Sequence, residues 1–266
     1  MATRFENQTV WITGGGTGIG RALAEQLAAE GARVVVSGRR LDRLEETVAG
    51  IHSAGGAAEA LVCDVVDEDA VKAAVAHIVD SHGGIDVVVA NAGYSTGGRL
   101  HQLPVADFRR QLDVNVIGLY STVHHALPHV MQRNGRIVLM GSVSYILTAP
   151  GTGAYSASKA AVHALGMCLS IELAGSGASC TVIHPGFVES EIGKVDNDGV
   201  YREGKTDRRP EKLMWTAEDA ARDMVTGIHK RQTEVIVTGH GKFANAMGRH
   251  LPGVTRSLIP RFWSKP

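Results

Sequence analysis

The chain has 266 residues, enough to bury a sizeable core as one α/β domain. Its 27 basic and 27 acidic side chains balance, so charge favours neither nucleic acid nor an acidic membrane surface as a partner. The first residues, MATRFENQTV, lack an apolar signal core and no stretch approaches the length of a membrane span, so we expect a soluble, cytoplasmic protein with no clear membrane segment.

Short apolar runs alternate with helical patterns along most of the chain. Strands that alternate with helices of ten or more residues imply right-handed βαβ crossovers. We therefore expect one α/β domain with a Rossmann-type, doubly wound parallel sheet of about seven strands, flanked by helices. The expected order is strand 9–13, helix 18–30, strand 33–37, helix 41–54, strand 58–63, helix 68–82, strand 86–90, a long helical stretch 105–132, strand 136–140, helix 154–173, strand 179–184, helix 217–230 and strand 234–238.

Two segments depart from this alternation. Residues 189–214 are polar and rich in glycine, which predicts a mobile substrate flap within a domain spanning 1–242. Residues 243–266 carry apolar side chains at helical intervals but are interrupted by Pro252 and Pro260. We expect this C-terminal extension to cap a substrate pocket or to contact another subunit, because its basic residues are too few and scattered for membrane binding.

The three cysteines, Cys63, Cys168 and Cys180, lie in apolar stretches without metal-like spacing. This pattern predicts buried thiols in a reducing compartment, and we expect no metal site.

A glycine-rich turn follows the first expected strand and leads into a helix. Its pattern is T-G-x-x-x-G-I-G, from Thr13 to Gly20. Glycines let the backbone turn tightly and approach a pyrophosphate, and the helix N-terminus offers free N–H groups. The alternative is an ordinary glycine-rich strand-to-helix turn. We expect a dinucleotide to bind at Gly14, Gly16, Thr17, Gly18, Ile19 and Gly20.

The end of the second strand indicates the choice of cofactor. NAD enzymes usually place a carboxylate there to hold the ribose 2′-hydroxyl, whereas this chain has Gly38 followed by Arg39 and Arg40. Guanidinium groups bind a 2′-phosphate through charge-assisted hydrogen bonds. NADP(H) is therefore favoured over NAD(H), although the arginines are also compatible with a solvated helix start.

Two further strand ends fall at the same edge of the expected sheet. Asp64 and Val65 follow one strand, and the triplet Asn91, Ala92 and Gly93 follows the next. Ligands of open α/β sheets bind outside the carboxyl ends of the strands, so both groups are candidate cofactor contacts. Asp64 would accept a hydrogen bond from the adenine amino group. Such residues also close strands simply as turns.

Tyr155 and Lys159 are four positions apart on the expected helix 154–173, so their side chains are neighbours on one face. A free phenol has a pKa of about 10, and a nearby ammonium group favours its ionised form. Ser142 ends the strand before this helix and would bring a hydroxyl to the same place. Together they can orient and protonate a carbonyl oxygen.

These motifs resemble the short-chain dehydrogenase/reductase family over about residues 8–237. The resemblance is carried by TGGGTGIG, the Asn91-Ala92-Gly93 triplet, Asn115, Ser142, the Tyr155-Ser-Ala-Ser-Lys159 run and Pro185-Gly186. It implies an oxidoreductase that interconverts a ketone or aldehyde and an alcohol. The alternatives are an epimerase or dehydratase on the same fold, or a non-catalytic nucleotide-binding regulator.

The resemblance also implies a role for each catalytic residue. Tyr155 would be the general acid in reduction and the base in oxidation, while Lys159 would hold the nicotinamide ribose and lower the pKa of Tyr155. Ser142 would position the substrate oxygen. Asn115 would hold a water that links Lys159 to solvent. Pro185, Gly186 and Val188 would border the nicotinamide, and Ser190 is a further candidate contact.

The chain departs from the family pattern at two places. NADP-preferring members often have a basic residue inside the glycine turn, and this turn has none, so Arg39 carries most of the preference. Many tetrameric members have Asp-Gly-Gly after the last strand, where this chain has Thr238, Gly239 and His240. We expect a homodimer or a homotetramer.

The substrate itself is weakly specified. Tyr94, Tyr145, Phe187 and Trp215, with Ile146 and Leu147, are candidates for an apolar lining, which favours a moderately hydrophobic small-molecule carbonyl or alcohol. The same residues are equally compatible with the core or an interface.

Overall fold

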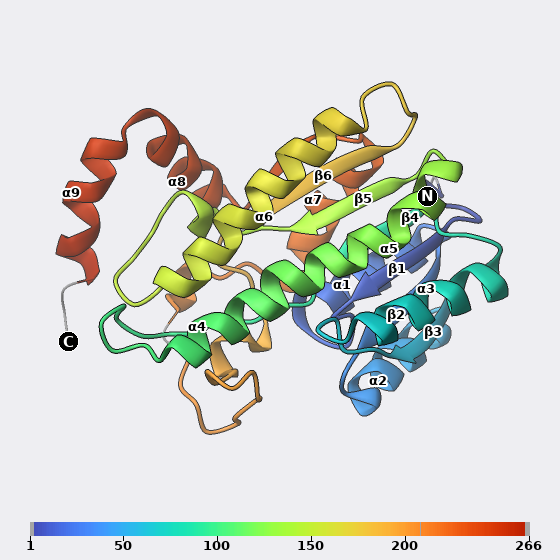
Figure 1. Ribbon diagram of the computed structural model, residues 1–266, viewed down its shortest axis with the longest axis horizontal. Helices are drawn as coiled ribbons and strands as arrows, with labels where there is room; N and C mark the ends of the chain where they lie inside the picture. The colour runs from blue at the N-terminus through green and yellow to red at the C-terminus, as the bar shows by residue number, and fades with distance from the viewer. Residues whose placement is uncertain (1–2, 208, 264–266) are drawn as a thin grey trace.

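The computed structural model describes residues 3–207 and 209–263 and is built around one parallel sheet (Figure 1). The seven strands lie in the order β3-β2-β1-β4-β5-β6-β7. The direction of winding reverses between β1 and β4, which is where an open α/β sheet binds its ligands. The strands are β1 Thr9–Thr13, β2 Arg33–Gly38, β3 Ala57–Val62, β4 Val87–Ala90, β5 Arg136–Met140, β6 Ser179–Pro185 and β7 Glu234–Val237.

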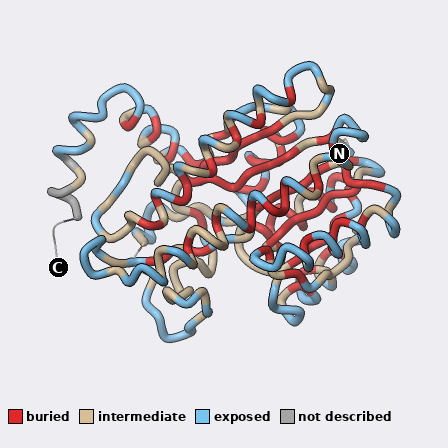
Figure 2. Tube along the Cα trace, in the orientation of Figure 1, coloured by how far each residue is buried: buried red, intermediate tan, exposed pale blue. Residues whose placement is uncertain are grey.

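Helices cover both faces of the sheet because the strand residues are apolar on both sides. Val10 and Ile12 of β1 pack with one set of helices, whereas Trp11 between them packs with the other set. Figure 2 shows the buried strands as the centre of the molecule. The first set is α1 Gly18–Ala29, α2 Leu41–Ser53 and α7 Ala217–His229; the second is α3 Glu68–His82, α5 Leu119–Gln132 and α6 Gly153–Glu172. The expected fold class is thus confirmed.

The expected helical stretch 105–132 is present but is not one regular α-helix. Helix α4 (Val105–Leu112) is followed by a π-helical turn, Asp113–Gly118, and then by α5. Such turns insert an extra residue and often occur at functional sites. The turn contains Asn115, whose side chain is thereby directed inward and is fully buried.

One expectation about the cysteines is wrong. Cys63 and Cys180 are buried, but Cys168 is exposed. The reason is helical periodicity: Leu169 and Val162 of α6 face the sheet, and Cys168 lies on the opposite side of the same helix.

The described residues of 189–207 and 209–214 form a loop-rich segment with short 3₁₀ turns and an antiparallel bridge between Val195 and Tyr201. Two helices then end the chain, α8 (Gly239–His250) and α9 (Pro252–Trp263), and Figure 1 shows them far from the N-terminus. The extension therefore begins as a helix directly after β7. Within the described part of the chain, no helix combines the length and the apolar composition needed to cross a bilayer.

Candidate active site

A cavity of about 850 Å³ opens at the carboxyl ends of the strands. It runs from the glycine turn after β1, past the ends of β2, β3 and β4, to the loops after β5 and β6. A volume of this size lies toward the upper end of the usual range for ligand sites. Every expected cofactor residue lines it: Gly14, Gly16, Thr17, Gly18, Ile19, Gly20, Arg39, Arg40, Asp64, Val65, Asn91, Ala92, Gly93, Tyr155, Lys159, Pro185, Gly186 and Val188.

The glycine turn is packed so closely, against itself and against a neighbouring loop, that side chains would not fit there. A Cβ at Gly20 would lie 2.2 Å from the carbonyl oxygen of Gly14, and Gly14 itself has a φ of +67°. Gly18 has a φ of +52°, and a Cβ there would lie 2.8 Å from the Cβ of Ser190. The turn thus exposes its backbone and the start of α1 to the cavity, as a pyrophosphate requires.

Asn91 lines the cavity and also holds the glycine turn in shape. Its side-chain Nδ2 donates to the carbonyl oxygens of Thr13, at 2.9 Å, and Gly14, at 3.2 Å. The Thr13 hydroxyl in turn accepts from the backbone N–H groups of Asn91 and Ala92. These bonds fasten the end of β4 to the turn after β1.

Arg39 and Arg40 lie in the cavity wall but differ in their partners. Arg40 pairs with Glu191 at 2.6 Å and lies over the Tyr201 ring. Arg39 donates a hydrogen bond of 2.8 Å to the carbonyl oxygen of Gly199. A carbonyl oxygen carries no full charge, so the charge of Arg39 is less neutralised than that of Arg40.

Asp64 and Val65 follow β3 at the same edge of the sheet and line the cavity. One carboxylate oxygen of Asp64 accepts from the backbone N–H of Val66 at 3.1 Å, which orients the side chain. Its second oxygen is available for a ligand donor.

Tyr155 and Ser142 line the cavity on opposite sides of a strand-to-helix connection. Burial raises the pKa of Tyr155, while the Ser142 hydroxyl and the positive charge of Arg209 lower it. Ser142 is held by its own loop, because its Oγ accepts from the backbone N–H of Ser144 at 3.2 Å. The phenol is therefore in its protonated form near neutral pH.

Lys159 is buried on α6, one turn after Tyr155. Its Nζ donates to the carbonyl oxygen of Met140 at 2.7 Å and lies 5.7 Å from the centre of the Tyr155 ring. Burial lowers the pKa of Lys159 to about 8. The structure therefore brings Ser142, Tyr155 and Lys159 into one wall of the cavity.

Asn115 does not line the cavity. Its Oδ1 accepts from the backbone N–H of Tyr94 at 3.1 Å, and its Nδ2 donates to the Tyr94 carbonyl and the Ser158 hydroxyl. The absence of a side chain at Gly93 makes this possible, since a Cβ there would lie 2.9 Å from Asn115 Oδ1. The side chain thus joins the loop after β4 to α6, and the water-holding role stays a prediction.

The candidate substrate residues divide into two pairs. Tyr94 and Phe187 line the cavity, whereas Tyr145 and Trp215 do not. The Tyr145 ring instead stacks on two histidines, His163 and His184. Trp215 instead forms an isolated parallel bridge with Val188.

Several residues that line the cavity belong to no recognisable sequence motif. Arg209 donates from Nη1 to the carbonyl of Val188 at 2.8 Å and from Nη2 to that of Ser190 at 2.9 Å. Helices α8 and α9 also contribute to the wall. The only signal for α8 and α9 was their apolar spacing, and Arg209 had none. The additional lining residues include Arg43, Thr148, Thr152, Ile192, Val200, Tyr201, Arg209, His240, Ala244 and Ile259, whereas Leu147 was a candidate for the lining.

Comparison with known proteins agrees with this geometry. The family model for short chain dehydrogenase matches residues 8–200. Serine 3-dehydrogenase of Rhizobium radiobacter is 34% identical over 192 residues, which is 72% of this chain and 76% of that protein.

Two solved structures share the whole fold. A short chain dehydrogenase/reductase from Burkholderia phymatum in complex with NAD superposes with a TM-score of 0.84 at 25% identity, covering 94% of this chain and 96% of that one. A short chain dehydrogenase from Burkholderia cenocepacia in complex with NADP gives a TM-score of 0.78 at 30% identity, covering 90% and 99%. The chain therefore belongs to the short-chain dehydrogenase/reductase family and is an NAD(P)-binding oxidoreductase that acts on an alcohol or carbonyl group.

Proposed function

We propose that the protein reversibly interconverts a moderately hydrophobic ketone or aldehyde and the corresponding alcohol, with NADP(H) as its preferred cofactor. The observation that carries this proposal is the meeting of Ser142, Tyr155 and Lys159 in the wall of the cavity that begins at the glycine turn. An epimerase or dehydratase on this fold would use the cofactor without net consumption.

The bound cofactor supplies the hydride for reduction and accepts it in oxidation. The protonated phenol of Tyr155 gives its proton to the substrate oxygen during reduction and takes a proton during oxidation. The Ser142 hydroxyl donates a hydrogen bond to the same oxygen and so orients it. Lys159, held by Met140, places a positive charge near the phenol and favours its ionised form.

The preference for NADP(H) rests on Arg39. The sequence at the end of β2 has no carboxylate, and within the described part of the chain the hydrogen bond of Arg39 goes to the carbonyl oxygen of Gly199. A guanidinium with its charge unpaired gains most from a phosphate. Arg40 contributes less to binding of the 2′-phosphate, because its charge is paired with the carboxylate of Glu191.

The substrate end of the cavity is bordered by the two segments outside the regular sheet. Ile192 and Val195 of the loop 189–214 line the cavity, and so do Ala244 of α8 and Ile259 of α9. These side chains are apolar, which favours a substrate with an apolar body beside its carbonyl. We propose that the loop is the substrate flap and that α8 and α9 cap the pocket.

The sequence supports a proposal on the quaternary structure and location. We propose a homodimer or homotetramer that works in the cytoplasm. The three free cysteines, Cys63, Cys168 and Cys180, fit a reducing compartment.

A substrate panel tests the reaction and the cofactor together. Aliphatic, aromatic and alicyclic ketones, aldehydes and alcohols are incubated with NADPH or NADH, or with their oxidised forms, and absorbance is followed. We expect net oxidation of NADPH by at least one carbonyl compound and slower turnover with NADH. Cofactor binding without net turnover across the panel would contradict the proposal and favour the epimerase, dehydratase or regulator alternatives.

A further inference from the structure

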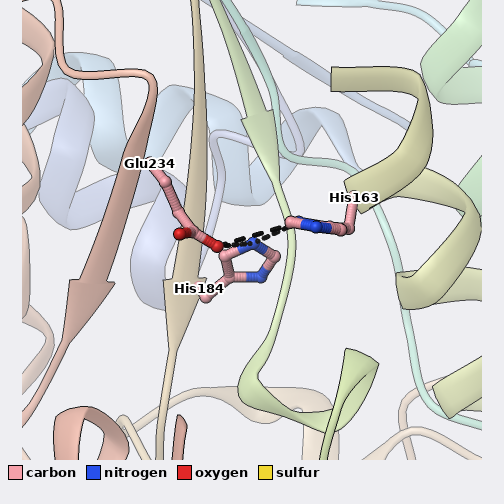
Figure 3. A group of neighbouring side chains, drawn as sticks. All are labelled: His163, His184 and Glu234. Atoms are coloured by element: carbon pink, nitrogen blue, oxygen red, sulfur yellow. Dashed lines mark hydrogen bonds and ion pairs between the residues drawn. The ribbon is translucent and has the colours of Figure 1, made fainter. Parts of the chain in front are cut away.

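A cluster of two imidazoles and one carboxylate lies close behind Ser142, outside the cavity. Figure 3 shows His163 from α6, His184 from β6 and Glu234 from β7 with their polar atoms directed toward one point. Among the described residues, these three form a group of metal-ligating side chains whose ligand atoms all lie within 4.8 Å of one another. None of the three lines the cavity.

The sheet register explains why these residues meet. Val182 of β6 faces the helices α3, α5 and α6, and His184, two residues later, has the same orientation. Glu234 is the register partner of Val182 on β7, so its side chain projects to the same face. His163 on α6 covers that face from above. The cluster is therefore fixed by regular elements rather than by loops.

The spacing of the three ligand atoms is that of a tetrahedral metal site. His163 Nδ1 and His184 Nε2 are 3.2 Å apart, and Glu234 Oε1 lies 3.7 Å from the first and 3.4 Å from the second. Zinc bonds of about 2.0–2.1 Å at tetrahedral angles place ligand atoms about 3.3–3.4 Å apart. Three lone pairs that converge at such distances repel one another unless a proton or a cation lies between them.

The surroundings of His184 supply the outer contact that a metal-ligating histidine usually has. Its Nδ1 lies 3.1 Å from the carbonyl oxygen of Ser142, to which a protonated Nδ1 donates, and 3.2 Å from the Ser142 backbone nitrogen, whose N–H donates to an unprotonated Nδ1. When Nδ1 carries the proton and donates to that carbonyl, Nε2 is left unprotonated toward His163 and Glu234. The ring of Tyr145 stacks on both imidazoles, with centroids 4.3 Å and 4.2 Å away, and fixes their planes.

Two features bear on how a cation reaches the site. The side chains of His163 and Glu234 are 24% and 20% exposed, so the cluster is open to solvent on one side although His184 is buried. On that side, Arg249 of α8 holds both carboxylate oxygens of Glu234, at 2.5 Å and 2.6 Å. The Arg249 side chain is 39% exposed, so it can move into solvent. It competes with a metal for Glu234.

We propose that His163, His184 and Glu234 form a zinc-binding site, with solvent as the fourth ligand, that stabilises the loop carrying Ser142 from behind. Two imidazoles and a carboxylate are borderline ligands that suit zinc rather than magnesium or calcium. The site is structural, because it contacts Ser142 only through that residue's backbone. This proposal departs from the expectation of no metal site, which was drawn mainly from the cysteine spacing.

Calorimetric titration of the full-length, untagged, chelator-treated protein with zinc chloride tests the proposal. We expect one tight site in the wild type. His163→Gln and Glu234→Gln should each weaken zinc binding by more than about tenfold. Loss of a residue that only supports a metal ligand already weakens metal binding by at least about that factor. Arg249→Gln should tighten binding, because it removes the competing cation and keeps all three ligands. Cobalt binding gives a second readout, since tetrahedral cobalt absorbs strongly in the visible.

The chain offers a matched control for adventitious binding. Glu59, His77 and His82 have the same residue types, but the two imidazoles bind different oxygens of the carboxylate. His77→Gln should therefore leave the tight site unchanged. Tight binding that is equal in the wild type, His163→Gln and Glu234→Gln would overturn the proposal. The absence of tight zinc binding in both the wild type and Arg249→Gln would also overturn the proposal. Arg249→Gln keeps all three ligands, so its result does not depend on whether the fold tolerates the loss of a ligand.

Discussion

The Nζ of Lys159 lies 5.7 Å from the centre of the Tyr155 ring, and its hydrogen bond goes to the carbonyl oxygen of Met140. The two groups respond to burial in opposite directions, because burial disfavours the charged form of each. Burial raises the pKa of Tyr155 and lowers the pKa of Lys159 to about 8. In the protein alone, the phenol is thus a proton donor that needs neighbouring positive charge before it becomes a base.

This relationship predicts opposite pH dependence for the two directions of the reaction. Oxidation needs ionised Tyr155, whose pKa is raised, so kcat/KM for an alcohol should increase as the pH rises above neutrality. Reduction needs protonated Tyr155, whose pKa is raised, so it should hold its rate through neutral pH and fall only at the alkaline pH where the phenol ionises. Profiles measured in both directions check this. An oxidation rate that falls between neutrality and about pH 9 would contradict it.

Removing the phenol hydroxyl should separate binding from catalysis. Tyr155→Phe keeps the ring in the cavity wall but has no proton to give, so we expect turnover to fall by about 10²–10⁴-fold. Binding of NADPH, followed by fluorescence, should be almost unchanged. Tyr120→Phe is the control, since Tyr120 is exposed on α5 and should retain full activity. Turnover retained in Tyr155→Phe would show that another group moves the proton.

The glycine turn makes a stereochemical prediction. A methyl group at Gly20 would lie 2.2 Å from the carbonyl oxygen of Gly14 and 2.6 Å from Asn91 Nδ2, and backbone cannot give way cheaply. Gly20→Ala should therefore lower the melting temperature and weaken NADPH binding at least about tenfold. Gly239→Ala is the control, because nothing lies within 4 Å of the added methyl group. Unchanged NADPH binding in Gly20→Ala would show that the turn is not part of the cofactor site.

Much of this site could be predicted because its residues come at strand ends. The glycine turn, Arg39, Asp64 and Asn91 each follow a strand, and parallel strands bring their carboxyl ends to one edge. Tyr155 and Lys159 share a helix face, so helical spacing alone places them together. The regular spacing of strands and helices was therefore enough to predict that these residues meet.

The rest depends on contacts that no local pattern encodes. Arg209 reaches the cavity because an irregular loop returns across it, and Ile259 does so because α9 folds back from the last strand. Tyr145 follows Ser142 by three positions, yet its 3₁₀ turn directs the ring to the histidine cluster instead. The predicted boundaries of the regular elements, by contrast, lie within one or two residues of those in the structure for most strands.

Cofactor preference should depend on Arg39 more than on Arg40. Arg39→Ser should raise KM for NADPH about tenfold or more, since a hydrogen bond to a charged group contributes about 1.5–3 kcal/mol. KM for NADH should change little. Arg40→Ser should have a smaller effect on NADPH, because Glu191 already neutralises Arg40. Steady-state kinetics of both variants with both cofactors test whether Arg39 affects the KM for NADPH more than Arg40 does. Equal changes for NADPH and NADH in Arg39→Ser would rule out a contact with the 2′-phosphate.

Arg209 offers the last prediction, as a positioning residue for the segment 188–190. Its guanidinium binds the carbonyl oxygens of Val188 and Ser190 and pairs with Asp207 at 2.7 Å. Ser190 in turn packs against Gly18 of the glycine turn. Arg209 thereby holds the segment 188–190 beside the glycine turn, in addition to the contacts that Arg39 and Arg40 make with the loop 189–214.

Arg209→Gln should release this segment and raise KM for the cofactor about tenfold, with a smaller change in kcat, because the loss of several charge-assisted bonds weakens the bound arrangement more than the chemistry. Arg209→Lys retains the charge but not the paired geometry, so it should restore the pH profile of Tyr155 without restoring KM. A variant that lowers kcat alone, with KM unchanged, would instead place Arg209 against the reacting atoms. The split between KM and kcat therefore decides between positioning the segment and acting on the substrate directly.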